Sequence, residues 1–198
     1  MIIYYSKNFR SNYFMDKDRK MYEKIICILE KEDTKLTTAE LARELRISKR
    51  TLYILFPNKA AIINETIDFV FYKFRNSWEK AVGKLLLSDL SRCRCSDFPN
   101  NSDVDKLIKF VVKIKNDYPE QQAKIQEKLD ELSELIYIYV VENENIRVLT
   151  STEKKVLQML IQQIFKRLLG EKYLKENGLD FKETVTSLFR MIFFGIKY

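Results

Sequence analysis

Residues 36–59 read LTTAELARELRISKRTLYILFPNK, and this stretch contains two helix-start signals close together. The first is Thr37 followed by Glu40, the pattern of a capping box, in which the hydroxyl accepts from the Glu40 N–H and the carboxylate reaches back. The second is Ser48, a good N-cap, and Pro57 closes the helix that follows it. The sequence therefore predicts two short helices joined by a tight turn.

Two helices this short must pack on a third element to be stable. Apolar residues repeat at helical spacing just upstream, at Met21, Ile25, Ile28 and Leu29, and predict a helix over 21–29. Three helices in this order form a helix-turn-helix unit, in which the second helix of the pair is presented to a DNA major groove. We expect Lys49, Arg50 and Thr51 at the front of that helix.

The charge pattern supports a nucleic-acid partner. The only charged residues between Glu44 and Glu65 are basic: Arg46, Lys49, Arg50 and Lys59. Residues 1–63 hold thirteen Lys/Arg against eight Asp/Glu, whereas the remainder holds twenty-two against twenty. A basic N-terminal part followed by a nearly neutral remainder is more typical of a protein that binds nucleic-acid phosphates than of one that binds a membrane surface.

The segment also resembles a known family. It is similar to the tetracycline-repressor (TetR) family at Thr37-Thr38, residues 39–45, Ile47-Ser48, Thr51-Leu52-Tyr53, Phe56 and Lys59. The Tyr-x-x-Phe-x-x-Lys run is the most specific part of this motif. The motif covers about the first third of the chain. The resemblance implies an all-helical homodimeric transcriptional regulator, usually a repressor, whose larger C-terminal domain binds a small molecule that lowers DNA affinity.

The same resemblance implies roles for single residues. By position, the residues that contact phosphate are Thr38, Tyr53 and Lys59, and those that contact base edges or nearby phosphates are Lys49, Arg50 and Thr51. The implied core residues are Leu41, Leu45, Leu52 and Phe56.

The turn between the two helices departs from the family, which usually has Gly where this chain has Arg46. A left-handed backbone is costly for a residue other than Gly, although a packed unit can absorb about 1 kcal/mol. Arg46 could add a phosphate contact, or it could be a solvated surface residue.

Composition favours helix throughout. The 198 residues are 46% hydrophobic, with only 4 Gly and 3 Pro, and are rich in Glu, Lys, Leu and Ile. We predict an all-α protein with an N-terminal arm (1–16), a helix-turn-helix domain (17–60) and a helical ligand-binding and dimerisation domain (61–198). The arm is expected to be flexible, an upstream extension before Met15, or a minor-groove contact through Lys7 and Arg10. Neither a secretory signal nor an apolar run of membrane-spanning length occurs, so we expect a cytoplasmic protein.

The sequence has no histidine, which excludes Ser-His-Asp and Cys-His catalysis, imidazole general bases and most zinc enzyme sites. The four glycines are scattered, so no phosphate-binding loop is present. Cys27, Cys93 and Cys95 are an odd set that indicates a reducing compartment, and Cys93 with Cys95 is a poor metal site. We therefore expect no enzyme activity, no cofactor and no metal.

A long helix is predicted from Asn58 onward, and Gly83 and the stretch 88–96 end this helix or a short helix after it. Further helices are predicted over 103–116, 120–141, 152–169 and about 180–195, with a loop over 92–102. We expect the main face of the 152–169 helix to carry Leu157, Leu160, Ile161, Ile164 and Leu168. A second apolar face on each of the last two helices, at Val156, Phe165 and Leu169 and at Phe189 and Phe193, indicates a dimer interface formed by 152–169 and 181–196.

Aromatic residues supply the predicted pocket. An apolar or aromatic small-molecule effector would suit a site lined by Phe71, Phe74, Trp78, Phe110, Tyr137 and Tyr139, although aromatics also fill cores. The first hypothesis is thus a repressor that binds a palindromic operator in double-stranded DNA and is released by this effector. The alternative is a helical dimer of the same fold that acts through a protein partner, without a small-molecule inducer.

Overall fold

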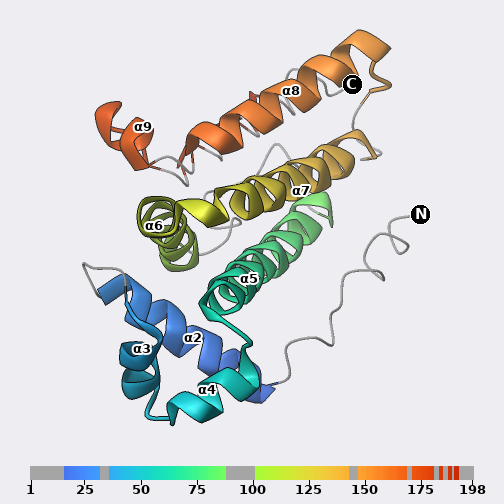
Figure 1. Cartoon of the computed structure of the whole chain (residues 1–198). Coiled ribbons are helices and arrows are strands. Elements are labelled where there is room, and N and C mark those ends of the chain that lie inside the picture. Colours follow the sequence, from blue (N-terminus) through green and yellow to red (C-terminus); the bar gives the residue numbers. More distant parts are fainter. Residues whose placement is uncertain are drawn as a thin grey trace. The chain divides into compact units, whose positions relative to one another are not determined.

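The computed structural model describes residues 16–31, 36–87, 101–142, 147–168 and 171–180, and the pairs 183–184, 187–188 and 190–191. Every regular element in these ranges is helical, as Figure 1 shows, so the predicted all-α class is confirmed. The elements are α2 (Asp16–Lys31), α3 (Thr38–Leu45), α4 (Lys49–Leu55), α5 (Lys59–Leu87), α6 (Asn101–Asp117), η3 (Pro119–Gln121), α7 (Gln122–Val141), α8 (Ser151–Leu168) and α9 (Glu171–Glu176). Among the described helices, none is long and apolar enough to cross a membrane.

The chain divides into two compact units, Met1–Phe69 and Val70–Tyr198, and the division falls inside α5. The predicted domain boundary at residue 60 falls at the start of the same helix. The predicted arm, residues 1–16, lies outside the described residues except for Asp16, which begins α2.

In the first unit, α2 packs on α3 and α3 packs on α4. The four predicted core residues are all buried: Leu41, Leu45, Leu52 and Phe56. The predicted stripe on α2 was partly wrong, because Met21 and Ile28 are only half-buried, whereas Tyr22 and Ile26 are buried.

The contacts of Tyr22 explain why the buried face of α2 differs from the predicted one. Its ring stacks on Phe69 with centroids 5.1 Å apart and meets Phe56 edge-on at 6.1 Å. Its hydroxyl donates to Glu65 Oε2 at 2.6 Å, so the polar end of the ring is also satisfied. These partners come from the end of α4 and from α5, and α2 therefore rotates to bring Tyr22 inward.

Both predicted helix starts are confirmed. The Glu40 N–H donates to Thr37 Oγ1 at 3.2 Å, and the Thr37 N–H donates to Glu40 Oε2 at 2.7 Å, which completes the capping box. The hydrogen bonds from the Thr37 backbone and side chain hold the pKa of Glu40 below its usual value. At the second start, the Thr51 N–H donates to Ser48 Oγ at 2.9 Å. The ends of α3 and α4 are thus set by local sequence.

The turn between α3 and α4 is closed by Arg46 in a left-handed conformation, with φ 58° and ψ 40°. The Arg46 N–H donates to the Arg43 carbonyl and the Ile47 N–H donates to the Ala42 carbonyl, both at 3.0 Å. These bonds satisfy two carbonyls at the end of α3 and fix the angle at which α4 leaves it. The turn therefore takes the left-handed geometry that favours glycine, without one.

We expect Arg46→Gly to stabilise the first unit by about 0.5–1 kcal/mol, because relief of the left-handed strain exceeds the added entropy of the unfolded chain. Urea unfolding would measure this change. The matched control is Arg43→Gly in the last turn of α3, where the backbone is helical and glycine should destabilise by up to about 1 kcal/mol. A loss of stability in Arg46→Gly would contradict the strain argument.

In the second unit, α7 packs along α8, η3 connects α6 to α7, and α9 packs on both α6 and α8. Apolar residues from all of these helices are buried between them, including Phe110, Ile114, Leu129, Ile136, Leu157, Ile161 and Leu174. In Figure 1, α7 and α8 run side by side along most of their length. The pair α7 and α8 has the most extensive helix–helix contact among the described helices of the unit.

Helix α8 begins at Ser151 behind a second capping box, formed by Thr150 and Glu153. Arg147 donates to both oxygens of the Glu153 carboxylate, from Nη1 to Oε2 at 3.0 Å and from Nη2 to Oε1. The Arg147 side chain is the main cause that lowers the pKa of Glu153 to about 2, followed by the Thr150 N–H. The Glu153 carboxylate is therefore ionised at neutral pH, and its hydrogen bonds hold the first turn of α8 in place.

Several predicted boundaries need correction. The predicted loop over 92–102 ends earlier, because Asn101 and Ser102 belong to α6, and its residues 92–100 lie outside the described residues. Helix α5 does not end at Gly83 but runs to Leu87, which agrees with the other predicted end at the stretch 88–96. Helix α9 was not predicted at all. Of the predicted last helix, the described residues Glu183–Thr184, Ser187–Leu188 and Arg190–Met191 are helical.

Candidate nucleic-acid interface

The outward face of α4 carries the residues predicted to contact bases. Leu52 and Phe56 lie one turn apart and are buried, so they fix the inward face of the helix. Lys49, Arg50 and Thr51 are exposed at its N-terminal end. The helix therefore presents two cations and a hydroxyl to solvent in its first turn, a combination suited to phosphates and base edges.

Two predicted phosphate contacts lie next to each other. Thr38 begins α3 and Tyr53 lies on α4, and their hydroxyl oxygens are 3.2 Å apart. The Lys49 ammonium is 6.0 Å from the centroid of the Tyr53 ring. Two hydroxyls thus lie together at the N-terminal end of α3, and an ammonium lies near the ring that carries one of them. Such a group can donate several hydrogen bonds to a single phosphate.

The other two basic residues of the predicted site differ in their surroundings. The Arg46 side chain is exposed at the turn, where it could reach a phosphate. The half-buried Lys59 donates from Nζ to the Leu36 carbonyl, just before α3. Lys59 therefore ties the start of α5 to the segment that precedes α3. Its phosphate contact stays a prediction.

The six aromatics of the predicted pocket do not share one environment. Phe71, Phe74 and Phe110 are buried, Tyr137 and Tyr139 are half-buried, and the side chain of Trp78 lies outside the described residues. Burial raises the pKa of Tyr139, nearby Glu79 raises it further, and Arg75 lowers it. Burial of the three phenylalanines agrees with a core role, and their part in ligand binding stays a prediction.

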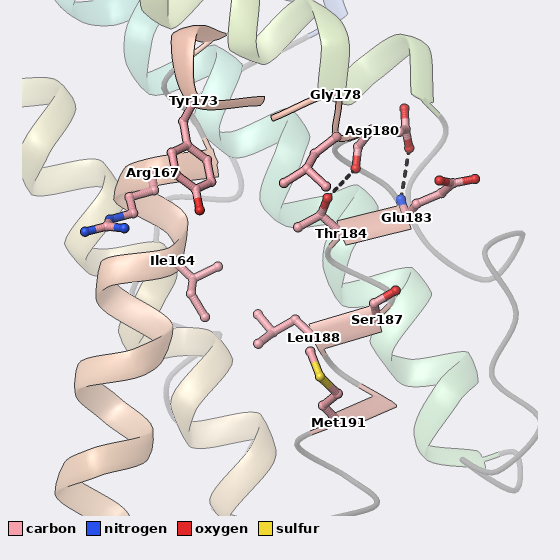
Figure 2. A pocket seen from close by; sticks show the side chains of 11 residues that line it. Ile164, Arg167, Tyr173, Gly178, Asp180, Glu183, Thr184, Ser187, Leu188 and Met191 are labelled. Carbon is pink, nitrogen blue, oxygen red and sulfur yellow. Dashed lines mark hydrogen bonds between the residues drawn. The ribbon is translucent and has the colours of Figure 1, made fainter. Parts of the chain in front are cut away.

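A pocket of about 450 Å³ lies elsewhere in the second unit, between α8, α9 and the segment that follows α9. Figure 2 shows Ile164 and Tyr173 on one side and Thr184, Leu188 and Met191 on the other. The Arg167 guanidinium lies 5.7 Å from the centroid of the Tyr173 ring. The pocket thus combines apolar walls with a few polar groups, as small-molecule sites do.

This pocket was missed because α9 was missed. Gly178 has φ 60°, and the Leu179 N–H donates to the Leu174 carbonyl at 2.9 Å, which is a glycine cap at the end of a helix. Beyond it, Asp180 Oδ1 accepts from the Glu183 N–H at 2.9 Å and the Asp180 carbonyl accepts from Thr184 Oγ1 at 2.6 Å (Figure 2). The Asn177-Gly178 pair was the sequence signal that could have revealed this turn.

Helix α8 also has an exposed apolar stripe. Val156, Met159 and Leu160 are 44%, 54% and 43% exposed and lie on one face of the helix at helical spacing. Leu160 was predicted on the main buried face, and that assignment is wrong, because Leu157 and Ile161 take the inward positions. The other residues predicted for this second face lie outside the described side chains: Phe165, Leu169, Phe189 and Phe193.

The geometry of the first unit is that of a helix-turn-helix, and it defines the protein as a DNA-binding transcriptional regulator. Comparison with known families confirms this class: the model of the bacterial regulatory proteins of the tetR family matches residues 31–66. Residues 31–66 of the first unit are therefore similar to the DNA-binding domain of tetR-family regulators. Comparisons with curated proteins and with solved structures gave no match.

Proposed function

We propose that the protein is a sequence-specific repressor that binds a palindromic operator as a homodimer and is released by a small-molecule effector. The observation that carries the proposal is the exposed first turn of α4, where Lys49 and Arg50 are the only charged residues and the buried Leu52 and Phe56 fix the inward face of the helix. A repressor must share the compartment of the chromosome that it binds, so we also propose a cytoplasmic location.

Dimerisation is supported by α8. Its exposed stripe of Val156, Met159 and Leu160 is an apolar surface that a second copy would cover. The interface would extend over the predicted segments 152–169 and 181–196, and an isologous contact would relate the two copies by twofold symmetry. Two recognition helices about 34 Å apart then meet successive major grooves of a palindrome.

Effector release is supported by the pocket, because its volume falls within the range of small-molecule sites. Ile164 and Arg167 belong to α8, the helix that also carries the exposed stripe. An apolar or aromatic ligand wedged beside this helix would shift the dimer contact and with it the spacing of the two DNA-binding units. A coupling of about 1–3 kcal/mol would lower operator affinity about 5–150-fold.

The proposal is tested by fluorescence anisotropy with duplex DNA from the region flanking the gene, across a salt series, with unrelated DNA as competitor. A repressor should bind a specific site tightly, and the logarithm of its affinity should fall steeply with the logarithm of salt concentration. Weak binding without preference, there and in sites selected from a random library, would reject the proposal in favour of a helical dimer acting through a protein partner.

Two variants distinguish base reading from phosphate binding. Arg50→Ala should weaken specific binding by about 1–3 kcal/mol per half-site and relax sequence preference, whereas loss of a phosphate contact in Lys49→Ala should weaken binding to all sequences and flatten the salt slope. The control is Lys109→Ala, which removes an exposed cation from α6 in the second unit. Equal operator affinity of Arg50→Ala and the parent would remove Arg50 from the interface.

A further inference from the structure

The recognition helix carries an exposed apolar side chain beside its basic residues. Ile54 is 75% exposed, although Leu52 and Phe56 on the same helix are buried. A single exposed isoleucine is ordinary on most surfaces. Its position on α4, within the surface proposed to meet DNA, is what gives this one a role.

Ile54 lies on the outward face of α4. It follows Arg50 by four residues and Thr51 by three, so the three side chains are neighbours on one side of the helix, and all three are exposed. Tyr53, by contrast, lies toward α3, where its hydroxyl meets that of Thr38. If Arg50 and Thr51 enter the major groove, Ile54 enters it one turn further along the helix.

An isoleucine in a major groove can favour one base over the others only through apolar contact, because its side chain has no donor or acceptor. Among the four bases, the apolar group in that groove is the C5-methyl of thymine. The branched side chain has few rotamers in a helix, so little entropy is lost when it is placed against that methyl group. Its wide exposure leaves its methyl groups available for the contact.

We propose that Ile54 is a specificity-determining residue that selects thymine in each half-site of the operator by contact with its C5-methyl group. The inference rests on the proposed function and adds a base preference to it. The thymine lies next to the base pair that Arg50 reads, because Ile54 adjoins Arg50 on the outward face. Arg50 and Thr51 would then supply polar readout, and Ile54 would supply the apolar part.

The test uses duplexes selected from a random library by the full-length parent protein. In the selected site, each thymine is replaced in turn by uracil, which removes only the methyl group. One thymine per half-site should prove sensitive, with a loss of roughly fourfold in affinity for one half-site and about fifteenfold for both. Ile54→Ala should bind the thymine and uracil duplexes equally, within about twofold, while keeping the salt slope of the parent.

Ile54→Val serves as the matched variant, since it keeps a branched apolar side chain and should retain most of the preference for thymine. The melting temperatures of both variants should stay close to that of the parent, because the side chain is exposed. If the parent binds a selected site specifically but no uracil substitution acts differently on parent and Ile54→Ala, the inference is overturned and the proposed function stands. If the parent selects no site, the proposed function fails and the inference fails with it.

Discussion

Phe56→Ala is expected to destabilise the first unit by about 3–5 kcal/mol and to abolish specific DNA binding. Phe56 is only 1% exposed, and its ring meets Tyr22 edge-on. Its N–H closes α4 by donating to the Leu52 carbonyl at 2.9 Å. Truncation removes a large apolar side chain and leaves a cavity beside Tyr22 of α2, and both effects are destabilising.

The size of this loss matters because small domains have a low free energy of unfolding. A whole domain is stable by about 5–15 kcal/mol, so a loss of 3–5 kcal/mol would unfold much of a three-helix unit at working temperature. Without its core, α4 cannot hold Lys49 and Arg50 in a fixed direction. DNA binding should therefore be lost although no DNA-facing residue has changed.

Urea unfolding, with hydrogen exchange followed on the amides of α2–α4, would measure the effect in the first unit. Leu55→Ala is the matched control, because Leu55 precedes Phe56 but is 45% exposed, and its truncation should change stability by much less. If Phe56→Ala and Leu55→Ala have the same stability as the parent, Phe56 is not the core residue that its burial indicates.

The parts of the fold that follow from neighbouring residues could be predicted from the sequence. Thr37 with Glu40 and Ser48 with Thr51 lie within one turn of each other, so their caps form whatever the rest of the chain does. The same rule applies to Thr150 with Glu153, and it would have placed the start of α8 at Ser151 instead of the predicted Thr152.

The parts that depend on distant residues could not be predicted in this way. The inward turn of Tyr22 needs Phe69 and Glu65, which are far away in sequence. Likewise, periodicity alone could not separate Leu157 from Leu160 on α8, because both fit a helical repeat and only the packing of α7 decides which one is buried. The pocket was beyond reach for the same reason, since its walls come from three segments.

In the DNA-binding unit, the residue types at the front of α4 could be read from sequence, but their arrangement could not. Thr38 and Tyr53 were each expected at a phosphate, and the structure brings their hydroxyls to 3.2 Å from each other. The exposure of Ile54 was also hidden, because an apolar residue in an amphipathic helix is ordinarily assigned to the core.

Met159→Glu is expected to convert the protein to a monomer and to lower operator affinity about 100-fold or more. Met159 is the most exposed of the three apolar residues of the α8 stripe and lies between Val156 and Leu160 on that face. In an isologous interface, the same patch of both copies is buried together, so two carboxylates would be desolvated in one apolar interface without a partner of opposite charge among the stripe residues. The dimer should then dissociate.

The effect on DNA binding exceeds that of any single base contact, because the loss of a dimer removes a whole half-site. Two linked half-site contacts can exceed the affinity of one by about 10²–10⁴-fold without any new interaction. Sedimentation velocity would report the oligomeric state, and anisotropy with the selected palindrome would report affinity. A monomer should still bind DNA weakly, with about half the salt slope of the dimer.

Ala123→Glu is the matched control, since it adds the same charge at an exposed position in the first turn of α7, where an acidic residue is tolerated. This variant should remain a dimer with the affinity of the parent. If Met159→Glu also stays dimeric and keeps its operator affinity within twofold, the α8 stripe is not the interface. A parent protein that is monomeric at every concentration would reject the homodimer itself, and the proposal that a ligand beside α8 acts by changing the spacing of two recognition helices would fail with it.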